Sequence, residues 1–226
     1  MDVDIYLIAI QFIVLLLSLS VHESAHAFTA DLLGDPTARY LGRVSLNPIV
    51  HADLFGTIIF PIMGFFTGFM FGWAKPVPVN VSKLRNPSRD YMLVAAAGPA
   101  SNLLMALGLF GLLMLVKFVS ADGSAVVRSV AYGGVPEGGN AILTQLALVA
   151  FYGVYLNLIL AIFNLIPVAP LDGAAVLSGL LPRSLAVAVD QIQPYGFMIL
   201  IGLMYLGVPN MLFTPVVRFF IQFLRV

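Results

Sequence analysis

The chain of 226 residues contains no cysteine, and only 10% of its residues are charged. The absence of cysteine excludes disulfides, thiolate catalysis and cysteine-ligated zinc sites. A soluble globular domain carries about 25% charged residues, so the low charge, with 60% hydrophobic residues and a mean hydropathy of +1.00, indicates a membrane protein. The formal net charge is zero and there is no block of basic residues, which argues against a nucleic-acid partner.

The chain has three histidines and two glutamates, and three of these residues fall within one pentapeptide, His22-Glu23-Ser24-Ala25-His26. The pentapeptide lies in an apolar stretch, where two imidazoles and a carboxylate are costly unless something compensates them. On a helix, His22 and His26 share one face and can bind one metal ion. Glu23 lies about 100° round the helix, where it can hold a metal-bound water. H-E-x-x-H on a helix is the signature of the zincins, a class of zinc peptidases.

A catalytic zinc ion usually takes three protein ligands and one water, so the pentapeptide is one ligand short. A third histidine at the extended zincin spacing is excluded, because Thr29 and Leu32 occupy the positions of its glycine and histidine. Glu137 lies in a Gly-rich polar stretch more than a hundred residues downstream. Asp172 directly follows a long apolar stretch and a Pro-x-x-Pro break, where a lone carboxylate needs a partner. We therefore predict Asp172 as the third ligand.

Charge balance supports this choice. A zinc ion held by two neutral histidines keeps its full charge, and the carboxylates of Asp172 and Glu23 would bring the site close to neutral. The remaining histidine, His51, is predicted to be an interfacial loop residue. The alternative is that its side chain lines the metal site.

Four stretches are predicted to form membrane helices, because they are apolar and long enough to span a bilayer. They cover residues 5–30, 90–116, 141–166 and 191–213. Within the second, Gly98-Pro99 and Asn102 are predicted to serve close packing and a kink. The tail from Pro215 alternates apolar and polar residues as an interfacial amphipathic helix does.

The region between the first two predicted helices has a different character. Residues 37–53 mix strand formers with glycine and proline, which predicts a short hairpin or an extended loop. Residues 54–73 are apolar but interrupted by glycine and proline, which favours a re-entrant or membrane-embedded element that does not span. Residues 75–80 are predicted to be extended, and residues 117–140 to be a polar loop. The expected fold is an all-α polytopic membrane protein, a bundle of about four to six transmembrane helices in a single domain, residues 1–226.

Two motifs together carry a family resemblance. His22-Glu-Ser-Ala-His26, combined with Asn164-Leu-Ile-Pro-Val-Ala-Pro-Leu-Asp172-Gly173, resembles the site-2 protease family of intramembrane zinc metalloproteases, peptidase family M50. Gly98-Pro99 and the segments 42–53 and 72–80 are similar to its compact prokaryotic branch. The PDZ and CBS domains of some members are not expected here.

This resemblance implies a hydrolase, a zinc metalloendopeptidase. His22, His26 and Asp172 would ligate Zn²⁺, Glu23 would activate the water, and Asn164 would position or stabilise the scissile carbonyl. The substrate would be the transmembrane segment of another membrane protein, cut within the bilayer by regulated intramembrane proteolysis. The alternatives are a zinc transporter or metal-handling membrane protein, and a non-catalytic scaffold of the same family. The sequence indicates no oligomeric state.

The distribution of positive charge predicts the topology, because Lys and Arg accumulate on the cytoplasmic side. Six basic residues lie between the first and second predicted helices, and two between the second and third. Residues 31–90 are therefore predicted to be cytoplasmic. If residues 54–73 do not span, the third helix brings Asp172 to the same side as the two histidines. We expect a multi-pass protein of the cell membrane with its active site nearer the cytoplasmic side.

Overall fold

The computed structural model describes residues 5–60, 63, 72–135 and 140–225, and these residues form helices and loops without a β-strand. Among these described residues, four helical stretches are long and apolar enough to cross a membrane. They are α1 (Ile5–Leu32), α5 (Pro87–Val119), α7 (Ala141–Asn164) and the stretch Arg183–Tyr205. The predicted all-α polytopic membrane fold is confirmed.

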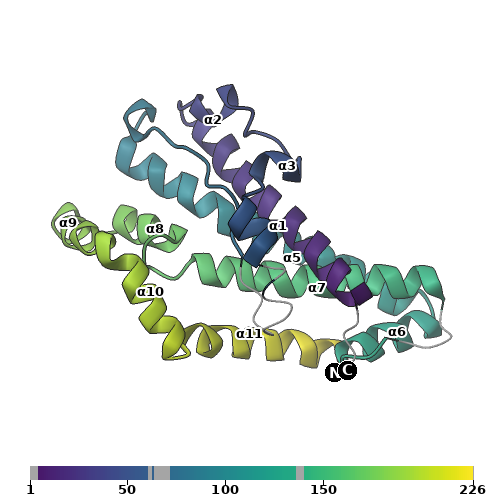
Figure 1. The fold of residues 1–226 in the computed structure, drawn as a ribbon. Helices are drawn as coiled ribbons and strands as arrows, with labels where there is room; N and C mark the ends of the chain where they lie inside the picture. The colour runs from purple at the N-terminus through teal and green to yellow at the C-terminus, as the bar shows by residue number, and fades with distance from the viewer. Residues whose placement is uncertain (1–4, 61–62, 64–71, 136–139, 226) are drawn as a thin grey trace.

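The centre of the molecule is a bundle of α1, α5 and α7, in which α5 packs against both of the others. Figure 1 shows α2 and α3 at one end of this bundle and α6 at the other. The core between the helices is aliphatic and includes Val14, Leu113, Leu148 and Val154. Burial of such side chains against one another holds the three helices in register.

Shorter elements complete the described part of the chain. They are α2 (Thr37–Tyr40), α3 (Pro48–His51), the π-helix η1 (Leu54–Ile59), the 3₁₀ helix η2 (Val81–Lys83), α6 (Ala121–Ala131), α8 (Asp172–Leu180), α9 (Arg183–Ile192), the 3₁₀ helix η3 (Gln193–Tyr195), α10 (Gly196–Tyr205) and α11 (Val208–Arg225).

The prediction of a hairpin or extended loop over residues 37–53 is wrong, because this region contains the two helical turns α2 and α3. The side chain of Asn47 accepts a hydrogen bond from the Ile49 backbone, and Pro48 occupies the first turn of α3. An asparagine cap followed by proline starts a helix, and this local pairing outweighs the strand propensity of the neighbouring residues.

The prediction of a loop over residues 117–140 is also wrong, because α6 occupies its first half. Ser120 caps α6 by accepting a hydrogen bond from the Gly123 backbone. Val126, Val127 and Val130 then recur at helical spacing and are buried in the core. The polar residues between them obscured this apolar face in the sequence.

The C-terminal helices differ from the prediction as well. The expected helix 191–213 ends early, since α10 stops at Tyr205 and Gly207 takes a positive φ of 72° before α11 begins. Only glycine adopts that conformation without strain. Phe220 and Leu224 of α11 are buried in the bundle core, whereas Phe219 and Phe223 are 73% and 51% exposed, so only part of the apolar face of this helix packs against the bundle.

The prediction of a re-entrant element at residues 54–73 falls largely on residues 61–62 and 64–71, which lie outside the described residues. The two described ends of this stretch meet. The Trp73 backbone N–H donates to the Gly56 carbonyl at 3.1 Å, and the Thr57 hydroxyl donates to the Trp73 carbonyl at 2.9 Å. One straight helix would separate residues 56 and 73 by about 25 Å. The stretch therefore starts and ends at the same depth.

Residues 74–80 follow as an extended segment, which agrees with the prediction for residues 75–80. Its ends are held by the region around α2 and α3. The Lys75 backbone donates to the His51 carbonyl at 2.9 Å, and the Asn80 backbone donates to Asp35 Oδ2 at 2.6 Å. Asp35 is buried at the end of α1 and also accepts the Thr37 backbone N–H at 3.1 Å.

Burial alone would raise the pKa of Asp35, but the hydrogen bonds from Thr37 and Asn80, with the nearby Lys83 charge, lower it below the ordinary value. Asp35 thus stabilises the fold in its charged form. This contribution is present above the ordinary carboxyl pKa of about 3.9 and is lost as the pH falls through the lower folded pKa.

Asp35→Asn is expected to lower the free energy of unfolding by about 1.5–3 kcal/mol at neutral pH, because the carboxylate accepts charge-assisted hydrogen bonds. The loss should shrink in acid, where the wild-type carboxyl is itself protonated. Denaturation in detergent at a series of pH values measures both effects, with the exposed Asp122→Asn as the matched control. A loss of equal size at all pH values would contradict the role given to the charge.

Candidate metal centre

Two histidines of α1 point into the interior of the bundle. His22 and His26 are only 4% and 8% exposed, and their Nε2 atoms lie 3.0 Å apart. The i, i+4 spacing on a helix places both rings on the face that packs against α5.

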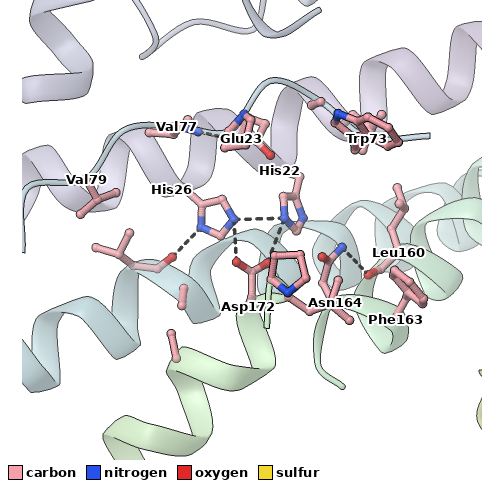
Figure 2. Close-up of a pocket in the computed structure, with 18 of the residues that line it drawn as sticks. His22, Glu23, His26, Trp73, Val77, Val79, Leu160, Phe163, Asn164 and Asp172 are labelled. Atoms are coloured by element: carbon pink, nitrogen blue, oxygen red, sulfur yellow. Dashed lines mark hydrogen bonds and ion pairs between the residues drawn. The ribbon is translucent and has the colours of Figure 1, made fainter. Parts of the chain in front are cut away.

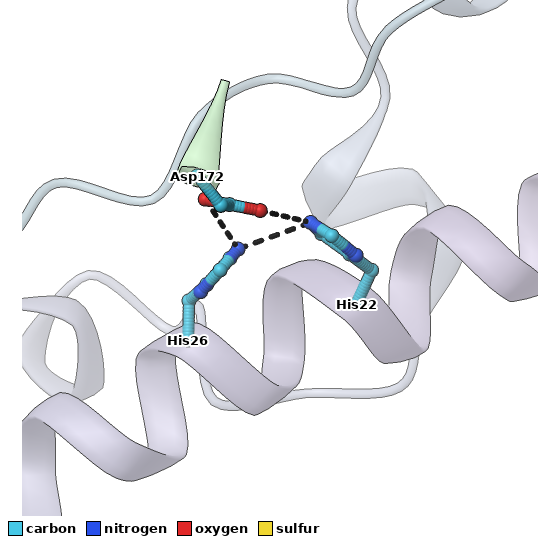
Figure 3. Close-up of side chains that lie close together, drawn as sticks. All are labelled: His22, His26 and Asp172. Atoms are coloured by element: carbon cyan, nitrogen blue, oxygen red, sulfur yellow. Dashed lines mark hydrogen bonds and ion pairs between the residues drawn. The ribbon is translucent and has the colours of Figure 1, made fainter. Parts of the chain in front are cut away.

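Asp172 reaches the same place from a distant part of the chain. Its Oδ2 lies 3.1 Å from His22 Nε2, and its Oδ1 lies 3.4 Å from His26 Nε2 (Figure 3). The carboxylate sits at the first residue of α8, and α8 packs against α5. The next residue is Gly173, where a Cβ would lie 2.4 Å from the Leu165 carbonyl oxygen. The glycine therefore lets the loop after α7 fold tightly beneath Asp172.

The structure thus brings together the three residues predicted as ligands, and one ligand atom of each lies within 4.8 Å of the others. His51 lies outside this group. It is the last residue of α3 and is buried, and its Nε2 donates to the Ser45 carbonyl at 2.7 Å.

The chemistry of the three atoms calls for a cation. The Val94 carbonyl oxygen, 2.7 Å from His26 Nδ1, can only accept, so Nδ1 carries a proton, and in the neutral ring Nε2 then presents a lone pair. Asp172 Oδ2 is buried, and no donor among the described residues hydrogen-bonds to it. Unprotonated acceptors that face one another repel unless a positive ion lies between them. Two imidazoles and one carboxylate, with room for water, are a donor set that suits zinc.

Glu23 lies beside the ligands and is engaged differently. Its Oε2 accepts the Val77 backbone N–H of the extended segment at 3.0 Å. This bond holds the carboxylate at the edge of the site and leaves the other oxygen available (Figure 2).

A cavity of about 500 Å³ adjoins the three ligands, Glu23 and Asn164. Its other walls are mostly apolar and include Trp73, Val79, Phe163 and Phe197. Asn164, at the end of α7, donates one N–H to the Leu160 carbonyl at 3.0 Å. A side-chain amide nitrogen carries two hydrogens, so one is available to a molecule in the cavity.

Two residues of α5 that sequence reasoning assigned to packing touch the candidate ligands directly. The side-chain oxygen of Asn102 lies 2.5 Å from His22 Nδ1. A Cβ added to Gly98 would lie 2.4 Å from His26 Nε2, so any side chain there would collide with the ligand. Val94, Gly98 and Asn102 follow one another at i, i+4 along one face of α5. That spacing, matched to the spacing of the two histidines, is the signal that could have found them.

The model of the family described as peptidase family M50 matches residues 10–207. The chain belongs to peptidase family M50. The matched range includes every candidate site residue named above.

Two curated relatives are similar along most of their length. "Putative zinc metalloprotease YwhC" of Bacillus subtilis (strain 168) is 38% identical over 193 residues, covering 84% of this chain and 78% of the relative. "Putative zinc metalloprotease Rip2" of Mycolicibacterium smegmatis (strain ATCC 700084 / mc(2)155) is 28% identical over 209 residues, covering 92% and 71%. No solved structure matches the chain. The family identifies the chain as a peptidase of the metalloprotease kind and gives no support to the alternative of a transporter.

Gly98→Ala is expected to weaken metal binding by about 100-fold or more, because the added methyl group displaces both histidine rings and misplaced ligands cost affinity. Gly108→Ala in the same helix is the matched control, since a Cβ there meets nothing within 4 Å. The control should leave the affinity for zinc unchanged. Its free energy of unfolding should be unchanged or higher by up to about 1 kcal/mol. Chelator competition for zinc measures the difference, and equal affinities for the two variants would refute the close approach.

Proposed function

We propose that this chain is an intramembrane zinc endopeptidase that cleaves transmembrane segments of other membrane proteins. One observation carries the proposal. Two imidazoles and a carboxylate converge, with a second carboxylate beside them, inside a bundle of helices long and apolar enough to span a membrane. The names of the two relatives, which describe zinc metalloproteases, support the choice of metal.

In this proposal His22, His26 and Asp172 hold the zinc ion. When bound, zinc acts as a Lewis acid and lowers the pKa of a coordinated water to about 7. The three side chains supply one negative charge in a buried site.

Glu23 is the proposed general base. It accepts a proton from the attacking water and returns that proton to the leaving amine, a role that contributes about 10²–10⁴-fold in rate. The Val77 N–H holds Oε2, so the free Oε1 is the oxygen positioned for proton transfer.

Asn164 is proposed to bind the scissile carbonyl. Its bond to the Leu160 carbonyl fixes the amide, and the second N–H is free to donate to a carbonyl oxygen in the cavity. Loss of one such donor typically costs about 2.7–4 kcal/mol in the transition state.

The substrate is proposed to be a transmembrane helix that unwinds locally, because a helix hides its peptide groups in internal hydrogen bonds. The extended segment 74–80 borders the cavity and is placed to bind the unwound strand. Its backbone donors are largely used, since Lys75, Val77 and Asn80 donate to other parts of the chain and residues 76 and 78 are prolines. A substrate strand would therefore pair with it mainly by donating to its carbonyl oxygens.

The active site is proposed to face the cytoplasm. Five of the six basic residues that precede Asp90 belong to the segments joining α1 to α5, and the sixth, Arg89, lies in the first turn of α5. His22 and His26 lie in the second half of α1, nearer to these segments than to its start. An excess of Lys and Arg marks cytoplasmic loops of multi-pass proteins in the cell membrane.

Cysteine labelling tests this orientation, because the chain has no cysteine of its own. Ser88→Cys, at the start of α5, should react in cells only after the membrane is made permeable to a polar maleimide. Ala125→Cys, in the exposed face of α6, should react without that treatment. The reverse pattern would place the active site on the outer side.

Glu23→Gln tests the proposed function. Reconstituted in liposomes with a membrane-protein substrate, the variant should keep its zinc and lose cleavage by about 10²–10⁴-fold, because only the proton acceptor is removed. Unchanged turnover, or a wild-type protein that binds no zinc, would reject the proposal.

Two further variants separate the roles within the same assay. Asp172→Asn should lose zinc and activity together. Asn164→Ala should keep zinc and slow cleavage by about 10²–10³-fold.

A further inference from the structure

Three polar side chains are buried in the bundle behind His22. Ser18 of α1, Asn102 of α5 and Asn157 of α7 are each 0% exposed. Polar groups at this depth in a membrane helix bundle are costly unless they are hydrogen-bonded to one another. They form one connected network that ends on the His22 ring, and the described mechanism makes no use of it.

The direction of each hydrogen bond follows from backbone carbonyls, which can only accept. Asn157 places the same amide nitrogen 2.8 Å from the Gly153 carbonyl and 2.8 Å from the Ser18 hydroxyl. The Ser18 hydroxyl donates its own hydrogen to the Val14 carbonyl at 2.8 Å. It must therefore accept from Asn157, and both hydrogens of the Asn157 amide are used.

These hydrogen bonds also fix the orientation of the Asn102 side-chain amide. With its nitrogen committed, Asn157 presents its Oδ1 to the Asn102 amide nitrogen at 2.7 Å. The same Asn102 nitrogen lies 3.4 Å from the Ser18 carbonyl, which again can only accept. The Asn102 oxygen is thus the atom that faces His22 Nδ1 at 2.5 Å. An oxygen acceptor there requires that Nδ1 carries a proton, and in the neutral ring this leaves the lone pair on Nε2.

We propose that Asn102, oriented by Asn157 and Ser18, is a positioning residue that fixes His22 in the Nδ1–H tautomer and so presents its Nε2 lone pair to the metal. His26 reaches the same tautomer by a simpler route, through the Val94 carbonyl. The proposal rests on the metal site described under the proposed function, but it makes a statement about the metal-free protein that can be tested separately.

The chain has three histidines, so ¹⁵N-histidine labelling gives three ring spin systems. In metal-free wild type at alkaline pH, His22 and His26 should show the Nδ1–H tautomer. His51 should show the opposite one, because its Nε2 donates to the Ser45 carbonyl. Single replacements of each histidine assign the signals.

Asn102→Leu should turn His22 into a mixture of tautomers and weaken zinc binding by about 10–100-fold, as loss of a ligand's hydrogen-bond partner does. His26 should be unchanged in the same spectrum, which makes it an internal control. Asn102→Asp should restore the Nδ1–H tautomer, because a carboxyl oxygen still accepts from Nδ1. The same variant loses the amide N–H groups that donate to Asn157 and Ser18. A residue with only a structural role would need those donors, so this variant would not restore it.

A His22 ring that stays Nδ1–H in Asn102→Leu, or that is Nε2–H in wild type, would overturn the proposal. If Asn102→Leu does not fold, Asn157→Leu replaces it, and this variant should give a smaller shift of His22 in the same direction; no shift would count against the network. A wild-type protein with the expected tautomers that binds no zinc would instead refute the proposed function.

Discussion

The structure depends on the meeting of three acceptor groups, two imidazoles and one carboxylate, in a largely buried place beside the cavity. His22, His26 and Asp172 offer two imidazole lone pairs and a carboxylate within a few ångströms of one another. Without a cation such an arrangement is repulsive, and repulsion is strong where the dielectric constant is low. A bound metal ion would turn the same arrangement into a direct link between α1 and α8.

Other elements of the bundle hold the three side chains and Glu23 in place. Helix α5 packs against both parts of the chain that carry the candidate ligands, and its glycine at residue 98 leaves out the side chain that would collide with His22 and His26. The extended segment after Trp73 closes the other side by holding Glu23 through the Val77 backbone. Asp35 in turn anchors the far end of that segment. The proposed general base is thus positioned by a chain of contacts that begins at the end of its own helix.

Much of this could be predicted from the sequence, because membrane burial makes polar residues conspicuous. His22, Glu23 and His26 stand out by spacing, and Asp172 by the cost of a lone carboxylate next to an apolar helix. The apolar length of α1, α5 and α7 likewise gave their approximate limits. These inferences needed only the spacing of residues along the chain and the free-energy cost of burying polar groups in a membrane.

Other features could not be predicted because they depend on which faces meet. Asn102 and Gly98 are ordinary helix-packing residues until α5 is placed against the two histidines. The burial of Phe220 and Leu224 depends on α11 folding back at Gly207, a turn that competes with continuation of an apolar helix. The turn of α3 depends on a single capping asparagine within a strand-like composition.

The most direct test of the central claim is the metal content and coordination of the purified protein, by elemental analysis with X-ray absorption at the zinc edge. The structure predicts one zinc ion per chain, bound by two imidazole nitrogens and by oxygen, with both the stoichiometry and the nitrogen signal lost in His22→Ala. Protein that contains no zinc, or zinc whose coordination is unchanged by that substitution, would contradict the account.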